Sequence, residues 1–260
     1  MHDMQGMEHS IHMHTEPKNV ITHNTNLQTQ PFPPVPGKET KFLFVVTEQR
    51  IGEPLREFEM EHEVPMHVVI VASDLSHFDH LHPELNQVTG LFSLSYLFRE
   101  AGSYKIWSDA TPNGASQCLT AFQIYVEGQP QHKRIELKQD KEPFIKKFQE
   151  DEYEIHLTFS APLVSKHDLI MTFTVKDENS KEITDLQRFL GAKGHCMAIS
   201  GDTREFLHVH PTEEVPRGWT GGPEVKFHTQ FTKPGLYKIW PQFQHNGKII
   251  TGNFVVSVSP

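Results

Sequence analysis

The sequence predicts an all-β protein with two tandem homologous antiparallel β-sandwich domains of the immunoglobulin or cupredoxin type. Three observations predict this fold class: a long motif occurs twice, the apolar runs are short and rich in β-branched and aromatic residues, and no segment shows a convincing 3.6-residue apolar period. The 260 residues suffice for two domains that each bury a core. Strands of this kind, separated by Gly, Pro, Asn and Asp in units of about 100 residues, are typical of a sandwich.

The internal repeat is the strongest of these observations. "MHVVIVASDLSHFDHLHP" (66–83) aligns without a gap with "GHCMAISGDTREFLHVHP" (194–211), at an offset of 128 residues. Downstream, "AGSYKIW" (101–107) and "PGLYKIW" (234–240) match at an offset of 133, so the second copy has gained five residues, which we assign to a surface loop at 216–224. The Tyr of each "YKIW" is placed to hydrogen-bond back across a corner, as in immunoglobulin-like domains.

The repeat also divides the chain. We predict a first domain at 38–128 and a second at 150–260, joined by a charged linker at 129–149 that can pair in part with the second domain. Residues 1–37 are predicted to be a disordered Met/His-rich tail that ends in the Pro-rich spacer "PFPPVPG".

Each copy of the motif is predicted to place three histidines on one face of a β-hairpin. If 66–83 turns after Asp74, residues whose numbers sum to 149 face one another, so His67 lies opposite His82. His80 shares their face because alternate residues of a strand point the same way. In the second hairpin, residues whose numbers sum to 405 face one another, so His195 lies opposite His210 and His208 shares their face. The predicted ligands are His67, His80, His82, His195, His208 and His210.

Three neutral imidazoles in such an arrangement are ordinary ligands for Cu(II) or Zn(II), and they leave a position for a further ligand. All three histidines are present in both copies of the motif, whereas a surface position such as Ser76 aligns with a different residue, Arg204. The structural alternative is that the histidines only bond loop carbonyls. The sequence leaves open whether both sites bind and whether the triads share one ion. Candidates for a fourth ligand follow each "KIW" strand: Asp109 in the first domain, and Gln242, Gln244 or His245 in the second.

The N-terminal stretch "MHDMQGMEHSIHMH" mixes thioether and imidazole groups. Soft sulfur ligands select Cu(I) whereas zinc gains little from thioethers, so the tail favours copper as the cofactor, with zinc as the alternative. The competing interpretation is a histidine-bearing linker or a cloning remnant. The residues predicted to capture metal are His2, Met4, Met7, His9, His12, Met13 and His14.

Composition narrows the possible partners. The formal net charge of −9 and the absence of a Lys/Arg cluster argue against nucleic acid. No window approaches the length of a membrane helix, and the first ten residues lack the apolar core of a signal peptide. Cys118 and Cys196 occupy non-equivalent positions in the repeat, so we expect buried free thiols and no disulfide.

From "HLHP" or "HVHP" through "GSYKIW" or "GLYKIW", both halves resemble the YtkA-like and FixH-like modules of exported bacterial proteins, which are associated with copper handling. The resemblance covers most of 38–260. It implies an extracytoplasmic location, as a secreted, periplasmic or cell-surface lipoprotein, with a signal or lipid anchor that this chain does not show.

The function expected from these features is non-enzymatic copper buffering, resistance or delivery to a cuproenzyme or metal transporter. An enzyme is disfavoured because no Asp or Glu that is free to act as a general base repeats at a fixed distance from the triads. The alternatives are a mononuclear metalloenzyme with an open three-histidine site, and an envelope scaffold with structural histidines.

Overall fold

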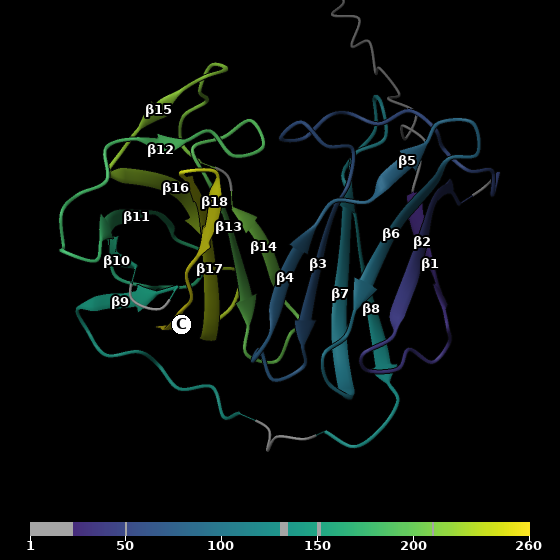
Figure 1. The fold of residues 1–260 in the computed structure, drawn as a ribbon, viewed down its shortest axis with the longest axis horizontal. Coiled ribbons are helices and arrows are strands. Elements are labelled where there is room, and N and C mark those ends of the chain that lie inside the picture. The colour runs from purple at the N-terminus through teal and green to yellow at the C-terminus, as the bar shows by residue number, and fades with distance from the viewer. Residues whose placement is uncertain (1–22, 50, 131–134, 150–151, 210) are drawn as a thin grey trace, which may run out of the picture.

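The computed structural model describes residues 23–260 except residues 50, 131–134, 150–151 and 210. The regular structure of these residues is entirely β, and the strands pair antiparallel in two sandwiches that lie side by side (Figure 1). This confirms the predicted fold class. In the same part of the chain, no helix has the length and apolar character needed to cross a membrane.

The first domain packs the sheet β1-β2-β6-β5 against the sheet β4-β3-β7-β8. Phe42 and Phe44 from one sheet and Val68 and Ile70 from the other are fully buried in its core. Its strands are β1 (His23–Gln30), β2 (Glu39–Glu48), β3 (His67–Ala72), β4 (Phe78–Leu81), β5 (Glu84–Asn86), β6 (Leu91–Leu97), β7 (Gly102–Ala110) and β8 (Cys118–Val126).

The second domain repeats the plan with the sheets β16-β11-β10-β9 and β14-β13-β17-β12-β15, and β18 and β19 also pair with β17. Phe173, Phe227 and Phe254 are fully buried between its sheets. Its strands are β9 (Phe144–Phe148), β10 (Tyr153–Phe159), β11 (Asp168–Asp177), β12 (Leu186–Gln187), β13 (His195–Ser200), β14 (Phe206–Val209), β15 (Thr220–Gly221), β16 (Glu224–Gln230), β17 (Gly235–His245), β18 (Lys248–Thr251) and β19 (Phe254–Val258).

Two predicted boundaries were wrong. The tail was predicted to be disordered to residue 37, but β1 pairs along the whole of β2, from His23 opposite Glu48 to Gln30 opposite Lys41. Its sequence, "HNTNLQTQ", has one large apolar residue, so it lacks the alternation that marks a half-buried strand. The second domain was predicted to begin at residue 150, but β9 already belongs to it through its pairing with β10, which is the partial pairing expected of the linker.

Both hairpin registers are confirmed. Val68 pairs with Leu81 in the first hairpin and Cys196 with Val209 in the second, so the facing numbers sum to 149 and 405. In the first turn, the carboxylate of Asp74 accepts the backbone N–H of Ser76 at 3.0 Å. In the second, Asp202 accepts the N–H of Arg204 at 3.1 Å. Short acidic side chains close such turns by this contact.

The tyrosine corners are also present in both domains. The hydroxyl of Tyr104 donates to the carbonyl oxygen of Glu100, and that of Tyr237 donates to the carbonyl oxygen of Lys233, each at 3.1 Å. These bonds fix the loop that leads into β7 and the equivalent loop that leads into β17.

The central strands β3 and β13 are buried on both faces, which explains their continuous apolar runs. One face of β3 covers the core of its own domain. On the other face, Val69 and Val71 pack with Met197 and Ile199 of the second domain. The two sandwiches are therefore joined by a third, smaller apolar cluster.

Aromatic stacking shows that the two domains meet with approximate two-fold symmetry. Phe78 stacks on Trp240 with ring centroids 4.8 Å apart, and Trp107 stacks on Phe206 at 5.1 Å. The repeat relates Phe78 to Phe206 and Trp107 to Trp240, so each contact is the symmetry counterpart of the other.

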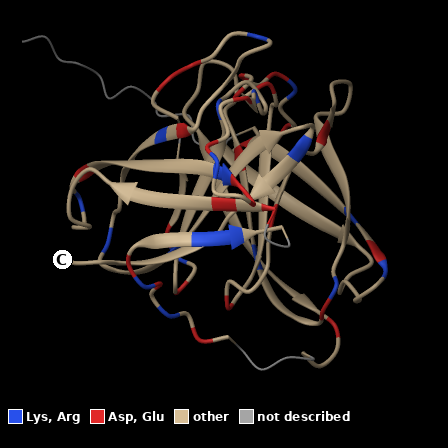
Figure 2. Cartoon of the chain, turned by 60° about the vertical axis from the view of Figure 1, so that its left-hand side comes forward, with Lys and Arg blue, Asp and Glu red and all other residues tan. Residues whose placement is uncertain are grey.

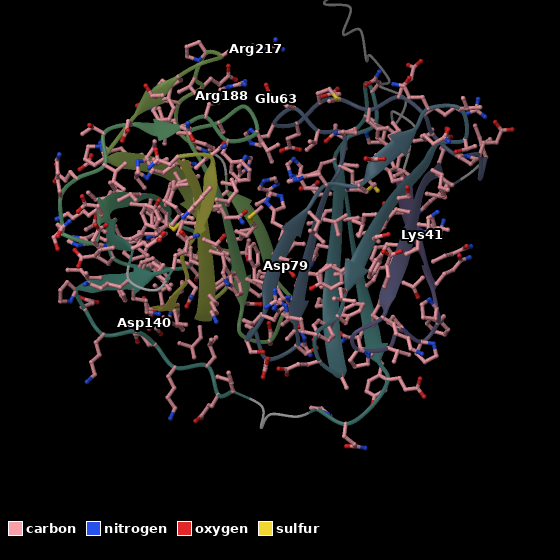
Figure 3. The ribbon with its side chains drawn as sticks, viewed as in Figure 1. Lys41, Glu63, Asp79, Asp140, Arg188 and Arg217 are labelled. Carbon is pink, nitrogen blue, oxygen red and sulfur yellow. The ribbon has the colours of Figure 1, made fainter. Side chains whose placement is uncertain are left out.

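Outside this interface, charged residues of both signs are spread over the loops and strand surfaces (Figure 2). An ion pair between Arg188 and Glu63 crosses between the domains, with Nη1 of Arg188 2.5 Å from Oε1 of Glu63, and Figure 3 shows the two residues between the sandwiches. Their loops are repeat counterparts, closed by the isolated bridges Glu61–Val64 and Phe189–Ala192.

Candidate metal centre

The face of each hairpin that carries the histidines packs against the other domain. His67 has the same parity along β3 as Val69 and Val71, which belong to the interdomain cluster. His80 pairs directly with Val69, and paired residues of neighbouring strands share a face. The counterparts in the second hairpin are His195, Met197, Ile199 and His208. The histidines of both hairpins therefore meet at the interface.

The first histidine group consists of His67, His80 and His82, all from one hairpin. Nδ1 of His67 lies 2.9 Å from Nε2 of His80, and Nε2 of His82 lies 3.2 Å from the same atom. Nε2 of His67 donates to the carbonyl oxygen of Glu61 at 3.1 Å, and Nδ1 of His80 donates to Oε1 of Gln242 at 2.8 Å. A neutral imidazole that donates from one nitrogen carries its lone pair on the other, so the lone pairs of His67 and His80 point at each other.

The second histidine group consists of His62, His195 and His208, and it draws on both domains. Nε2 of His195 donates to the carbonyl oxygen of Phe189 at 3.1 Å, and Nδ1 of His208 donates to Oδ2 of Asp109 at 3.2 Å. The lone pair of His195 is then on Nδ1, a buried atom with no hydrogen-bond partner among the described residues. His62 lies edge-on to His195, with ring centroids 4.7 Å apart.

The supporting hydrogen bonds follow the repeat. His67 and His195 each donate to the carbonyl of the residue six positions earlier. His80 and His208 are each held by the residue two positions after the "KIW" tryptophan, and in both cases that residue comes from the opposite domain. Each domain therefore orients one histidine of the other domain's hairpin.

This exchange corrects the predicted fourth ligands. Asp109 and Gln242 were assigned to the sites of their own domains, but they contact His208 and His80 across the interface. In each case the contact is with Nδ1 of the imidazole ring. Their observed role is to set the orientation and tautomer of the imidazole.

The structure does not bring His245 or Gln244 to either group. His245 lies at the end of β17, where Nδ1 is 3.1 Å from the hydroxyl of Tyr153 and Nε2 is 3.3 Å from Oδ1 of Asp185. Gln244 pairs with Ile249 of β18. The reason is that β17 continues beyond Gln242 as a paired strand, which carries the next residues away from the interface. His210 and the predicted tail ligands lie outside the described residues.

His62 is the group member that the sequence comparison missed. It occupies the tip of the 61–64 turn, with a positive φ of 50°, and its counterpart Leu190 has the same backbone conformation with φ of 46°. A search restricted to histidines present in both copies passes over it for this reason. The only sequence signal was the spacing of "HEVPMH", which places His62 five residues before His67.

The two groups are in contact. The rings of His67 and His208 meet edge-to-face with centroids 4.9 Å apart, and those of His80 and His195 are 5.7 Å apart. Within the first group the ring separations are 4.5 to 5.1 Å. The closest approach between the groups is therefore as short as the spacing within one of them.

Burial keeps His80, His82 and His195 neutral. Burial, followed by the charges of the neighbouring histidines, holds the pKa of His80 well below its usual value of 6.5, and the same causes act on His195. Burial lowers the pKa of His82 to about 4. Near neutral pH these rings carry available lone pairs, which is the form that binds a metal.

One carboxyl group beside the centre has the opposite shift. Burial, and then the charge of Asp109, raises the pKa of Glu61 from 4.5 to about 7. The negative potential around Asp109 therefore extends to the turn that carries His62.

The first group has dimensions suited to a metal ion. Metal–nitrogen bonds of about 2.0 Å at angles near 90–110° separate the ligand nitrogens by about 2.8–3.3 Å, and the observed separations from His80 are 2.9 and 3.2 Å. Two lone pairs at such a distance repel unless a cation lies between them. The low pKa of His80 makes a proton a poor candidate for that cation. In the second group, as in the first, one ligand atom from each histidine lies within 4.8 Å of the others.

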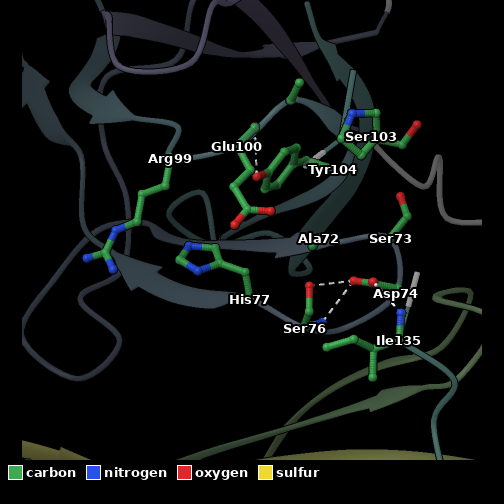
Figure 4. A pocket seen from close by; sticks show the side chains of 13 residues that line it. Ala72, Ser73, Asp74, Ser76, His77, Arg99, Glu100, Ser103, Tyr104 and Ile135 are labelled. Carbon is green, nitrogen blue, oxygen red and sulfur yellow. Dashed lines mark hydrogen bonds between the residues drawn. The ribbon is translucent and has the colours of Figure 1, made fainter. Parts of the chain in front are cut away.

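Two surface hollows differ in their relation to this centre. A hollow of about 550 Å³ reaches Asp109 and His208 from the side of β14 and β16. The other, of about 620 Å³, lies at the turn that carries Asp74 and is lined by Arg99, Glu100 and Tyr104 (Figure 4). There the carboxylate of Asp74 accepts the N–H of Ile135 at 3.0 Å and attaches the linker to the first domain.

The sequence matches a family model described as a domain of unknown function (DUF8832) over residues 18–128 and 147–260. The chain belongs to the DUF8832 family. The two matched segments coincide with the two sandwiches, and the first begins upstream of β1. No curated protein matches the sequence.

Solved structures resemble this DUF8832 protein only distantly. The Escherichia coli adhesin FdeC is 10% identical with a TM-score of 0.31, covering 93% of this chain and 66% of its own. Red sea bream transglutaminase is 11% identical with a TM-score of 0.27, covering 91% and 31%. A Salmonella α2-macroglobulin mutant is 12% identical with a TM-score of 0.30, covering 92% and 15%. The chain thus spans less than two thirds of each, and TM-scores this low support no inference about it.

Proposed function

We propose that this DUF8832 protein binds copper at the two histidine groups and serves in copper buffering, resistance or delivery to a cuproenzyme or transporter. The extracytoplasmic location and the kinship with YtkA-like and FixH-like modules, both implied by the sequence resemblance, belong to the same proposal. Its role is to hold the metal.

The geometry of the first group carries the proposal. Nδ1 of His67 and Nε2 of His82 both lie within hydrogen-bonding distance of Nε2 of His80, and the contacts with Glu61 and Gln242 fix the tautomers of His67 and His80 so that their lone pairs point at each other. Structural histidines would be expected to satisfy each other as donor and acceptor, whereas His67 and His80 face each other as two acceptors.

Copper is preferred to zinc because of the tail. Imidazole groups suit both metals, but the Met/His composition of the first fourteen residues suits Cu(I). In this proposal the tail collects or passes on Cu(I).

The test is elemental analysis after copper and zinc are offered together. It uses a full-length tail variant in which the predicted tail ligands are replaced by alanine: His2, Met4, Met7, His9, His12, Met13 and His14. We expect this variant to retain copper, and His80→Ala with His208→Ala in the same background to lose it.

His156→Ala is the matched control, because His156 lies on β10 beside Glu154 and is remote from the interface cluster. The control should bind as much copper as its parent. Retention of copper by the double variant would mean that the histidine groups are structural. If the protein bound zinc instead of copper, the histidine groups would remain the metal site, but the assignment of copper would be refuted.

A further inference from the structure

We infer that the two histidine groups form one dinuclear centre, in which two copper ions lie close enough to share a small anionic ligand. This rests on the proposed function and deepens it, because it concerns how the ions in that site are related. Two separate mononuclear sites, one in each domain, were the simpler expectation from the repeat.

The contacts between the groups carry the inference. His67 belongs to the first group and His208 to the second, yet their rings touch at 4.9 Å, which leaves no room for another side chain between them. His67 also lies 6.1 Å from His195 and 6.2 Å from His62, measured between ring centroids. Proteins that use two metal ions together hold them about 3.5–4 Å apart, and ligand rings in mutual contact are compatible with such a pair.

The supporting hydrogen bonds argue for one centre with two halves. Gln242 orients His80 and Asp109 orients His208, so each half is completed by the opposite domain. The second group also takes His62 from the first domain. Docking of the domains therefore assembles both halves at once.

Charge balance explains why an anion should bind between the ions. The ligands in both groups are neutral imidazoles, whereas two Cu(II) ions bring four positive charges. Asp109 is buried against His208, so one carboxyl group lies beside the centre. It offsets at most a quarter of the added charge, and uncompensated charge in a buried site is costly. A small anion such as hydroxide offsets part of the remainder.

Such a ligand has a way in. The half-buried His62 and His82 lie at the edge of the centre, and the hollow lined by Asp109 and His208 approaches it from the second domain. Three nitrogen ligands leave an open coordination position on each ion. Azide, a small anion that bridges copper pairs, is the suitable probe.

The experiment is electron paramagnetic resonance of the tail variant loaded with Cu(II), combined with copper analysis and titration with azide. We expect two copper ions per chain but a signal well below one spin per ion, because the spins of bridged Cu(II) ions couple. Azide should change the optical spectrum of the pair.

Two milder variants separate the halves. His82→Ala weakens the first group, and His62→Leu introduces into the second group the residue that the repeat has at Leu190. Each should bind one copper ion that gives a full, uncoupled signal. His77→Ala is the control because His77 contacts Asp79 and Tyr96 and belongs to neither group, and it should keep the coupled pair.

The outcomes are distinct. Two copper ions with two full independent spins would refute the dinuclear centre and leave the proposed function intact. If each chain bound one copper ion and both variants lost it, the dinuclear centre would be refuted and the two groups would share a single ion. Absence of copper from the tail variant would refute the proposed function itself.

Discussion

Asp109 of the first domain accepts a hydrogen bond from His208 of the second, with 3.2 Å between Oδ2 and Nδ1 and both side chains almost fully buried. Its repeat counterpart Gln242 accepts one from His80 at 2.8 Å. Domain docking and orientation of the histidines are therefore parts of one arrangement. A histidine held in this way is fixed in tautomer and direction before any metal arrives, which favours binding.

Asp109→Ala should lower copper affinity at the second group. Contacts of this kind usually contribute about 10–100-fold to metal affinity, and the carboxylate also increases the basicity of His208. Gln242→Ala should act on the first group with a smaller effect, because a neutral amide has no charge to contribute. Competition with a chromophoric chelator measures both, and Gln123→Ala, whose amide contacts the carbonyl of Tyr104, is the control. Equal affinities in all variants would mean that the interdomain contacts do not tune the site.

The metal-free protein should lose stability as the pH falls from about 6.5 towards 4. In this window the unfolded chain protonates its histidines, while folded His82, with a pKa of about 4, stays neutral. The unfolded state then binds more protons, so the free energy of unfolding falls with pH, by at most about 3 kcal/mol for His82 at about 1.4 kcal/mol per pKa unit. Its partial exposure reduces that figure. His80 and His195 act in the same direction.

Glu61 opposes this trend, because its raised pKa of about 7 lets the folded state bind the extra proton between pH 4.5 and 7. Three histidines outweigh one carboxyl group, so the net loss towards acid remains. Urea unfolding between pH 4.5 and 7.5 measures it, and His82→Ala should flatten the profile. A profile that is already flat in the parent protein would contradict the neutral, buried state of the histidines.

The sequence predicted the hairpins well because their register depends on local chemistry. Asp74 and Asp202 mark the turns, and the alternation of His80 with His82 follows from strand geometry. The partner of each hairpin was harder to predict. "HVVIVA" is apolar at both parities, which indicates that both faces are covered, but an apolar pattern does not say by what.

Three further residues show what a repeat comparison leaves out. His62 was missed because Leu190 occupies its position in the other copy. Gln242 and Asp109 were assigned to the sites of their own domains, because sequence distance gave no indication that these strand residues contact histidines of the opposite domain. In a duplicated protein, differences between the copies can mark the residues that serve the shared site.

The tyrosine corners should contribute to stability without affecting metal. Tyr104→Phe and Tyr237→Phe each remove one hydroxyl that donates to a backbone carbonyl at 3.1 Å. A hydrogen bond of this type contributes about 0.5–1.5 kcal/mol, so each variant should unfold at lower denaturant concentration with unchanged copper content. Loss of copper in either variant would show that the corner also positions the adjoining "KIW" strand.

The stacked aromatic pairs should influence copper affinity from a distance. Phe78 and Phe206 do not belong to either histidine group, but they stack on Trp240 and Trp107 and hold the domains together. Such an aromatic pair contributes about 0.5–1.5 kcal/mol beyond its buried area, so Phe78→Ala with Phe206→Ala should weaken docking while each sandwich keeps its own core. Copper affinity should then fall although every ligand is present, and copper should raise the unfolding temperature less than in the parent.

Calorimetry with and without copper measures this, with Phe32→Ala, an exposed aromatic, as the control. Unchanged affinity in the double variant would mean that each hairpin binds metal without its partner domain, and the interface would lose its role in the site.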